Sequence, residues 1–459
     1  MKMKGFYLVS YSVKGIKTLE DLVTLSFYKK TISKNPDTQE YNIKGIYGMN
    51  GSGKTGIITS MDILKSLIVS PGYLSNPMVQ NNLEAIINKK TKSLFVEVEF
   101  LATLKDVLVL FKYSITLSKD NMGKYVISQE KLLSKKATSR STEFDMIFEV
   151  ADGKIVYIAE SKDDDFNGII SEKSTNLLSA NTMSGLFFEK VVYDIIKANK
   201  RYDNPCFEGL FVLLVFGRRV HVYLDKADDH REFFIRNTIG WTGSFVKEGS
   251  EVDDIVRNFV EMDGDFLNVV SAYGNYVPKT EYKKFAATVR KLYAFISIFK
   301  SDLQDIEIDK KEDENFFVCN LIMVYDSYKV HAEFESTGIK KLIKLFAYLT
   351  EMVQGDIVFI DEFDSNLHDV YLCALLEYLM EYGEGQLCFT THNVGPMDIL
   401  KRNKMSIDFL SEDNKIYSWK TNGNYSPSKL YRNGMIEGSP FNVDSIDFIG
   451  VFDSSGEGE

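Results

Sequence analysis

A glycine-rich loop that ends in Lys54 and Thr55 holds residue types suited to phosphate chemistry. Its sequence is GMNGSGKT over residues 48–55, with the spacing G-x-x-x-x-G-K-T. Glycines let successive backbone amides point at a phosphate, the lysine would bridge the β- and γ-phosphates, and the threonine hydroxyl would ligate Mg²⁺. The loop therefore predicts a nucleotide site. Its candidate residues are Gly48, Asn50, Gly51, Ser52, Gly53, Lys54, Thr55 and Gly56.

The segments on either side of this loop favour the same interpretation. A short apolar run, Ile43 to Tyr47, reads as a strand, and Gly56 to Val69 is compatible with a helix. A helix N-terminus offers unpaired amides and a favourable dipole to an anion. The alternative is a glycine-rich turn that ends in Lys-Thr by coincidence, and the flanking strand and helix disfavour it.

A second segment, GDIVFIDE over residues 355–362, ends in two carboxylates. Four consecutive apolar residues describe a buried parallel strand, and open α/β sheets bind ligands at the carboxyl ends of such strands. Asp361 would hold Mg²⁺, and Glu362 would orient or deprotonate the attacking water. A strand that ends in solvated acids is the simpler alternative. The presence of the Lys54 loop in the same chain disfavours it.

Two further segments could complete the site. The strand-like run QLCFTTH ends in His392, which is either a structural histidine or a sensor of the γ-phosphate. Ser336 and Gly338 open a segment with helical spacing, Ile339 to Gln354, where Ser336 is a plausible N-cap. A Ser-x-Gly turn at a helix N-terminus is also a second anion site. A second site has a use if two chains face each other.

Composition sets outer limits on the function. The chain has 459 residues, 44% of them hydrophobic, and a net charge of −11, which argues against general coating of DNA. Four scattered cysteines predict reduced thiols and no zinc site. The sequence opens without a secretory signal, and its most apolar run, Leu210 to Phe216, is too short to span a bilayer. These features predict a soluble cytoplasmic protein with no membrane contact.

Hydrophobic patterning predicts an α/β fold in which a mixed sheet is flanked by helices and interrupted by a helical insertion. An N-terminal lobe with the glycine-rich loop is expected over 1–150, a largely helical insertion over 151–304, a second lobe over 305–425, and a tail over 426–459. Helices are expected near 182–200, 252–259 and 281–300, and an acidic linker over 305–314. In the last of these helices one apolar stripe is expected, formed by Phe285, Val289, Leu292, Ile296 and Phe299. Strands are expected at 6–13, 22–28, 43–47, 94–100, 107–117, 125–133 and 316–325.

In order, these four segments resemble the ABC-type P-loop ATPase heads of the SMC, RecF and OLD branch, and in particular stand-alone OLD-like AAA ATPases. The resemblance implies ATP and Mg²⁺ as ligands and a head-to-head homodimer or a higher homo-oligomer. In such a dimer, ATP would lie between one subunit's Lys54, Thr55, Asp361, Glu362 and His392 and the other's Ser336 and Gly338. The choice of adenine follows from the resemblance alone.

Some motif positions depart from the family pattern. The usual signature is L-S-G-G-Q, and here Glu335, Thr337 and Ile339 replace the leucine, the first glycine and the glutamine. His368 stands where the D-loop aspartate is expected, and Gln129 is the nearest candidate for the Q-loop glutamine.

Full-length OLD proteins continue into a nuclease domain, whereas about 35 residues follow the last strand-like stretch here. The chain therefore resembles ATPase subunits of anti-phage systems such as PARIS or Septu, which implies a nucleotide-dependent sensor or regulator with a separate effector, such as a nuclease.

A RecF-like ATPase that binds DNA in repair or maintenance is the alternative, and a scaffold that binds ATP without turnover is a third possibility. Basic residues could supply the DNA contact, although a solvated helix face is the favoured interpretation of them. They are Lys283, Lys284, Arg290 and Lys291, and a second cluster of Lys190, Lys197, Lys200 and Arg201.

Overall fold

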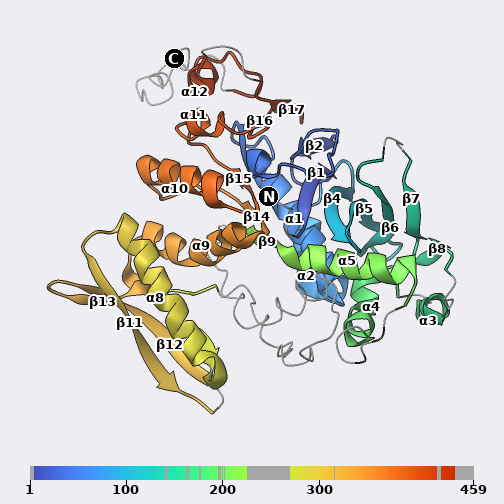
Figure 1. Cartoon of the computed structure of the whole chain (residues 1–459), viewed down its shortest axis with the longest axis horizontal. Coiled ribbons are helices and arrows are strands. Elements are labelled where there is room, and N and C mark those ends of the chain that lie inside the picture. The colour runs from blue at the N-terminus through green and yellow to red at the C-terminus, as the bar shows by residue number, and fades with distance from the viewer. Residues whose placement is uncertain are drawn as a thin grey trace, which may run out of the picture.

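The computed structural model describes residues 5–139, 143–161, 165–174, 177–194, 198, 200, 202–224, 269–314, 316–420 and 425–439. Over these ranges the predicted α/β fold is confirmed, with helices packed against mixed and antiparallel sheets (Figure 1). The helix expected near 252–259, residues 197 and 201 of the second basic cluster, and the tail beyond 439 lie outside the described residues. Among the helices in the described ranges, none combines the length and apolar character needed to cross a membrane.

The central sheet brings together strands from distant parts of the chain. Five of its strands are parallel, and β17 pairs antiparallel with β16 at one edge. Every residue of the five parallel strands is buried, as expected for strands covered on both faces. The order across the sheet is β17 (Ile416–Ser418), β16 (Ile407–Leu410), β3 (Ile43–Gly48), β15 (Gln386–Thr390), β14 (Ile357–Ile360) and β9 (Val220–Tyr223).

An antiparallel sheet forms the other large layer. Along β4, buried residues alternate with partly buried ones, which is typical of a sheet with one well-covered face. The helix that follows the glycine-rich loop, α1 (Lys54–Val69), shares one hydrophobic core with this sheet. In order, the sheet contains β2 (Val23–Ser26), β1 (Tyr7–Lys14), β4 (Ser93–Leu104), β5 (Val107–Lys119), β6 (Tyr125–Lys136), β7 (Asp145–Ala151) and β8 (Lys154–Ile158).

The segment expected as a helical insertion also supplies strands. Within its described residues, the helices are α3 (Asp165–Lys173), α4 (Met183–Val192), α5 (Pro205–Arg219) and α8 (Tyr282–Phe299), and α5 contains the apolar run noted in the sequence. The chain passes from α5 directly into β9, which is an edge strand of the central sheet. Residues 220–223 therefore belong to the same sheet as β3, the strand that leads into the glycine-rich loop. The boundary between a head and an insertion remains a prediction.

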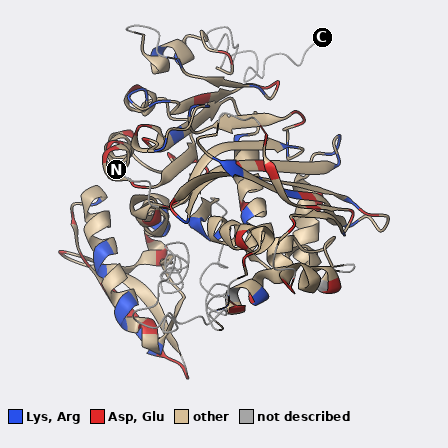
Figure 2. Ribbon diagram, turned by 45° about the vertical axis from the view of Figure 1, so that its right-hand side comes forward, with Lys and Arg blue, Asp and Glu red and all other residues tan. Residues whose placement is uncertain are grey.

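A small antiparallel sheet and one long helix form a peripheral arm (Figure 1). The helix, α8 (Tyr282–Phe299), buries Phe285, Val289, Leu292 and Ile296 against the sheet, which confirms the stripe predicted from their spacing. Several lysine and arginine residues are marked along this helix in Figure 2, and Lys283, Arg290 and Lys291 among them are exposed. The sheet contains β10 (Asn275–Pro278), β12 (Phe316–Tyr325), β11 (Leu303–Glu312) and β13 (Lys329–His331).

The expectation of an acidic linker over 305–314 is wrong. Most of this segment is strand β11, which pairs with β12 from Leu303 to Glu312. Ile306 is buried and Ile308 is half-buried, while the charged residues that alternate with them are exposed. The high charge hid a strand whose apolar side chains repeat every second residue.

The remaining elements surround the central sheet and connect it to the arm. Helix α9 (Thr337–Gln354) leads into β14, and α10 (Asp369–Tyr382) follows it. The other helices are α2 (Pro77–Ile86), α11 (Met397–Leu400) and α12 (Pro427–Arg432), and short 3-10 turns occupy Gln39–Tyr41, Tyr73–Ser75, Lys279–Glu281 and Ala332–Phe334.

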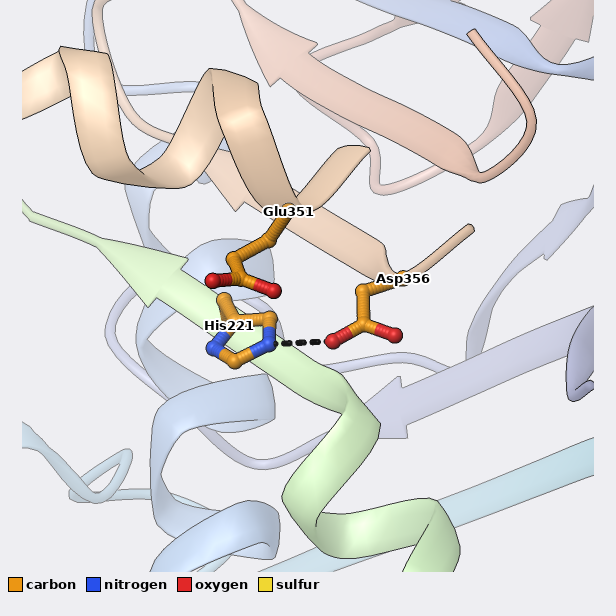
Figure 3. A group of neighbouring side chains, drawn as sticks. All are labelled: His221, Glu351 and Asp356. Carbon is orange, nitrogen blue, oxygen red and sulfur yellow. Dashed lines mark hydrogen bonds and ion pairs between the residues drawn. The ribbon is translucent and has the colours of Figure 1, made fainter. Parts of the chain in front are cut away.

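A largely buried ion pair joins the end of α5 to the residue before β14, at the amino-terminal edge of the sheet. Arg219 Nη1 lies 2.6 Å from Asp356 Oδ1, and His221 Nε2 lies 2.8 Å from Asp356 Oδ2. Glu351 of α9 points toward the same place (Figure 3), and the possible ligand atoms of His221, Glu351 and Asp356 lie within 4.8 Å of one another. The positive charge of Arg219 already lies beside the Asp356 carboxylate, so it would repel a divalent cation there. We therefore interpret the cluster as a structural contact.

Replacing Asp356 with alanine should destabilise the protein, because it leaves a guanidinium that is only 15% exposed without its carboxylate. We expect the free energy of unfolding to fall by about 3 kcal/mol, as measured by urea denaturation. Asp413→Ala is the matched control, since Asp413 pairs with Lys415 on the surface, and its midpoint should not change. An unaltered midpoint in Asp356→Ala would contradict this account of the cluster.

Candidate nucleotide-binding site

The glycine-rich loop connects β3 to α1, as the sequence predicts. Gly53 precedes α1 with a φ of +107°, a conformation that L side chains rarely adopt, and a Cβ atom there would lie 2.4 Å from the side chain of Leu19. At Gly48 a Cβ atom would lie 2.4 Å from the carbonyl oxygen of Leu410. Glycine is therefore required at both ends of the loop. The N-terminus of α1 follows the second of these glycines directly.

Lys54 is buried within the loop, with only 6% of the residue exposed. Its ammonium donates hydrogen bonds to the carbonyl oxygens of Gly48 and Met49, at 2.8 Å and 2.9 Å. Burial lowers its pKa to about 8, against the opposing effect of the negative charges of Asp361, Glu362 and Asp364. The structure thus brings Lys54 into the field of the carboxylates that follow β14, although about 300 residues separate them in the sequence.

The two predicted acidic residues follow β14. A threonine of the adjacent strand binds the carboxylate of the first and the backbone N–H of the second. Thr390 Oγ1 donates to Asp361 Oδ1 at 2.6 Å and accepts from the backbone N–H of Glu362 at 2.8 Å. Asp361 is buried, whereas Glu362 is exposed and has a φ of +47°, an uncommon value for a residue other than glycine. Thr390 lies two residues before His392, but nothing in its local sequence indicates this role, which depends on a neighbouring strand.

His392 follows β15, the strand between β3 and β14. Partial burial lowers the pKa of the imidazole below its usual value, and the positive charge of Lys54 lowers it further. The negative charges of Asp364, Glu362 and Asp361 have the opposite, smaller effect. This shift favours the neutral form of the ring, and solvent reaches it. The structure thus places His392 in the same electrostatic cluster as Lys54 and the two carboxylates.

The loop also contains unused hydrogen-bonding capacity. Ser52 is 2% exposed, and its hydroxyl has no hydrogen-bond partner within the described part of the chain. Thr55 lies in the first turn of α1, and Asp361 supplies carboxylate oxygens of the kind that Mg²⁺ prefers. An orphaned hydroxyl and a buried lysine at a helix N-terminus fit a phosphate group.

A hollow of about 520 Å³ lies beside the loop and reaches Asn50 and Gly51. Thr18 borders it, and its hydroxyl donates to the carbonyl oxygen of Gly51 at 3.0 Å. Its lining residues are mainly polar and charged, so the hollow is not itself evidence of a ligand site. The sequence does not reveal the hollow, because it is formed by loops that are distant along the chain. Its lining is Lys17, Thr18, Glu20, Asn50, Gly51, Asn88, Lys89, Lys90 and Glu412.

Ser336 and Gly338 begin α9, where the sequence places them. Ser336 is exposed and caps the helix by accepting from the N–H of Ile339 at 3.3 Å. A Cβ atom on Gly338 would lie 2.5 Å from the carbonyl oxygen of Asn366, so this glycine lets α9 approach the loop after β14. Both residues therefore have a structural task within one chain. Their expected contact with a partner's nucleotide stays a prediction.

Two substituted or uncertain motif positions also have local partners. His368 precedes α10 and caps it, with Nδ1 accepting from the N–H of Val370 at 3.4 Å. Gln129 lies on β6, and its amide donates to Glu149 at 3.4 Å. These contacts describe a helix cap and a cross-strand pair, and neither one assigns a nucleotide-binding role.

The strand, loop and helix around Lys54, with the carboxylates after the parallel strand β14, define a P-loop nucleotide-binding protein. Residues 275–398 match a family model described as "AAA domain, putative AbiEii toxin, Type IV TA system". This range includes the arm, α9, β14 and His392, and lies outside the glycine-rich loop. Together, the loop geometry and this match support a P-loop ATPase of the AAA type.

Comparison with solved structures finds a similar chain titled "Structure of the recombination mediator protein RecF-ATPrS in RecFOR pathway". The superposition covers 91% of this chain and 100% of the other, at 10% identity and a TM-score of 0.38. None of the curated proteins matches this chain.

Nucleotide affinity should fall as the pH rises above about 8. Without ligand, Lys54 loses its proton near that pH, and bound phosphates would favour the charged ammonium, so binding takes up a proton. We expect the Kd for ATP to rise by up to about tenfold per pH unit between about pH 8 and about pH 9.5, as measured by equilibrium titration.

Lys54→Arg is the control for this titration. Arginine stays charged throughout that range, so the pH dependence should disappear even if the affinity is lower. A wild-type Kd that stays constant across the range would contradict the assignment of Lys54.

Proposed function

We propose that the chain hydrolyses ATP at the carboxyl edge of the central sheet. The observation that carries this proposal is the electrostatic cluster of Lys54, Asp361, Glu362 and His392, which β3, β14 and β15 place together. Lys54 would bind the β- and γ-phosphates, and His392 would donate a hydrogen bond to the γ-phosphate. Glu362 is exposed at the end of its strand and would accept a proton from the attacking water. Thr55 and Asp361 would hold Mg²⁺, which neutralises phosphate charge when bound.

We further propose that ATP closes a head-to-head homodimer. The Ser336 turn is exposed at the N-terminus of α9, a helix from Thr337 to Gln354, and such a terminus favours an anion. In a dimer of this kind, Ser336 and Gly338 of one chain would face the nucleotide held by Lys54 of the other.

The biological role that we propose is a nucleotide-dependent sensor or regulator in anti-phage defence, which binds or releases a separate effector such as a nuclease. The description of the matched family names a putative AbiEii toxin of a TA system, which supports a chain that acts with a partner.

The charges of the peripheral arm favour a protein partner over DNA. Lys283, Arg290 and Lys291 of α8 are exposed, but exposed acids such as Asp305 and Asp309 occupy β11 of the same arm. Because the arm carries both signs of charge and the chain has a net charge of −11, its long-range attraction for a polyanion is weakened. The RecF-like, DNA-binding function is therefore the second candidate.

Glu362→Gln should abolish hydrolysis and retain ATP. The amide keeps the shape of the side chain but cannot accept the proton, so phosphate release should fall by at least about 100-fold while the Kd for ATP stays the same. Glu381→Gln, an exposed change on α10, is the control and should leave phosphate release at the wild-type level. Normal turnover in Glu362→Gln would remove Glu362 as the base.

Affinity capture from the native host tests the biological role. With Glu362→Gln as bait, we expect one protein companion whose recovery differs between ATP and ADP, identified by mass spectrometry. Lys54→Ala, which should not bind nucleotide, is the control and should lose the difference. Recovery of DNA that depends on ATP and on salt, without a protein companion, would support the RecF-like function instead.

A further inference from the structure

Lys341 is a buried cation on α9 that contacts the backbone next to the proposed base. It is 4% exposed, and its ammonium donates to the carbonyl oxygen of Glu362 at 2.5 Å and to the hydroxyl of Ser365. A buried ammonium is costly unless hydrogen bonds compensate for its lost hydration. Both of these hydrogen bonds go to the segment that follows β14, so the charge is used to hold that segment in place.

We propose that Lys341 is a positioning residue that sets the direction of the Glu362 side chain. The inference rests on the proposed hydrolysis. Thr390 binds the N–H of Glu362 at 2.8 Å, and Lys341 binds its carbonyl oxygen. The peptide groups on both sides of the Glu362 Cα are thereby fixed, so they set the direction of its Cα–Cβ bond and with it the region that its carboxylate can reach.

The backbone at Glu362 needs such support. Its φ of +47° lies in the left-handed region, which costs about 1 kcal/mol or more for a residue with a side chain. Such a conformation persists only where the surroundings enforce it. The N–H of Ser365 also donates to the Glu362 carbonyl oxygen, at 3.0 Å, which tightens the turn that Lys341 covers. Loss of the ammonium should let this turn relax.

The same helix presents the Ser336 turn, so Lys341 connects the two halves of the proposed site. Gly338 packs against the carbonyl oxygen of Asn366, and Thr337 Oγ1 lies 3.1 Å from Asn366 Oδ1. The first turns of α9 are therefore fastened to the 362–366 segment at two places. A shift of the Ser336 turn when it meets a ligand would reach the backbone of Glu362 through Lys341.

Lys341→Met tests this inference, because methionine keeps an unbranched apolar stem and removes the charge. We expect amide hydrogen exchange in the peptide spanning 361–368 to rise by at least about tenfold, since a hydrogen bond to a charged group is lost. Exchange in the 48–55 peptide should not change. In steady-state assays, kcat should fall by about tenfold or more while the KM for ATP changes by less than about threefold. A role limited to global stability would raise exchange in both peptides.

Lys344→Met is the matched control, since Lys344 lies on the same helix and is half-buried, and neither measurement should change. Lys341→Arg keeps a cation and should recover part of the lost protection. If Lys341→Met does not fold, Ser365→Ala removes one acceptor and should raise exchange in 361–368 by a smaller factor.

Unchanged exchange in 361–368 would overturn the inference, whether or not the wild-type chain hydrolyses ATP. A wild-type chain without turnover would instead refute the proposed function, and the exchange measurement would still decide the role of Lys341.

Discussion

The site depends on one constraint, the parallel alignment of β3, β15 and β14 as neighbours in a sheet buried on both faces. Parallel strands present their carboxyl ends at one edge, so the loop after β3, the carboxylates after β14 and the histidine after β15 must converge. Any slip of one strand would move its polar end away from the others and expose apolar residues. The hydrophobic core therefore fixes the site, and the polar residues determine only what it can bind.

Electrostatic balance at this edge follows from the convergence. Lys54 is buried beside carboxylates, so the cost of its desolvation is opposed by their charge. Its ammonium binds carbonyl oxygens of its own loop, and in a nucleotide complex phosphate oxygens would take their place. The positive charge of Lys54 also acts on His392, where it disfavours a second proton on the imidazole and so lowers its pKa. Cation, carboxylates and a neutral imidazole together suit a polyanion whose charge is redistributed during reaction.

Sequence reasoning located the parts of the site that lie within single motifs. The glycine-rich loop, the strand ending in Asp361 and the apolar stripe of α8 follow from local spacing, and the structure has them where the spacing puts them. It missed what depends on contacts between distant segments. Thr390 and Lys341 gain their importance from a neighbouring strand and helix, and the hollow near Thr18 is built from separate loops. Strand β11 was misread because its charges outnumber its apolar residues.

Helix α9 is the element that relates the arm to the site. Figure 1 shows α9 between the arm and the central sheet. Near its N-terminus, Ile339, Leu342 and Ile343 pack into the core of the arm, and farther along, Leu345 and Tyr348 pack into the core of the central sheet. Since both cores are close-packed, the helix cannot shift against one without repacking against the other. Lys341 lies in the first half and binds the backbone beside Glu362. A partner that displaces the arm would therefore act on the proposed base through a helix that is common to both cores.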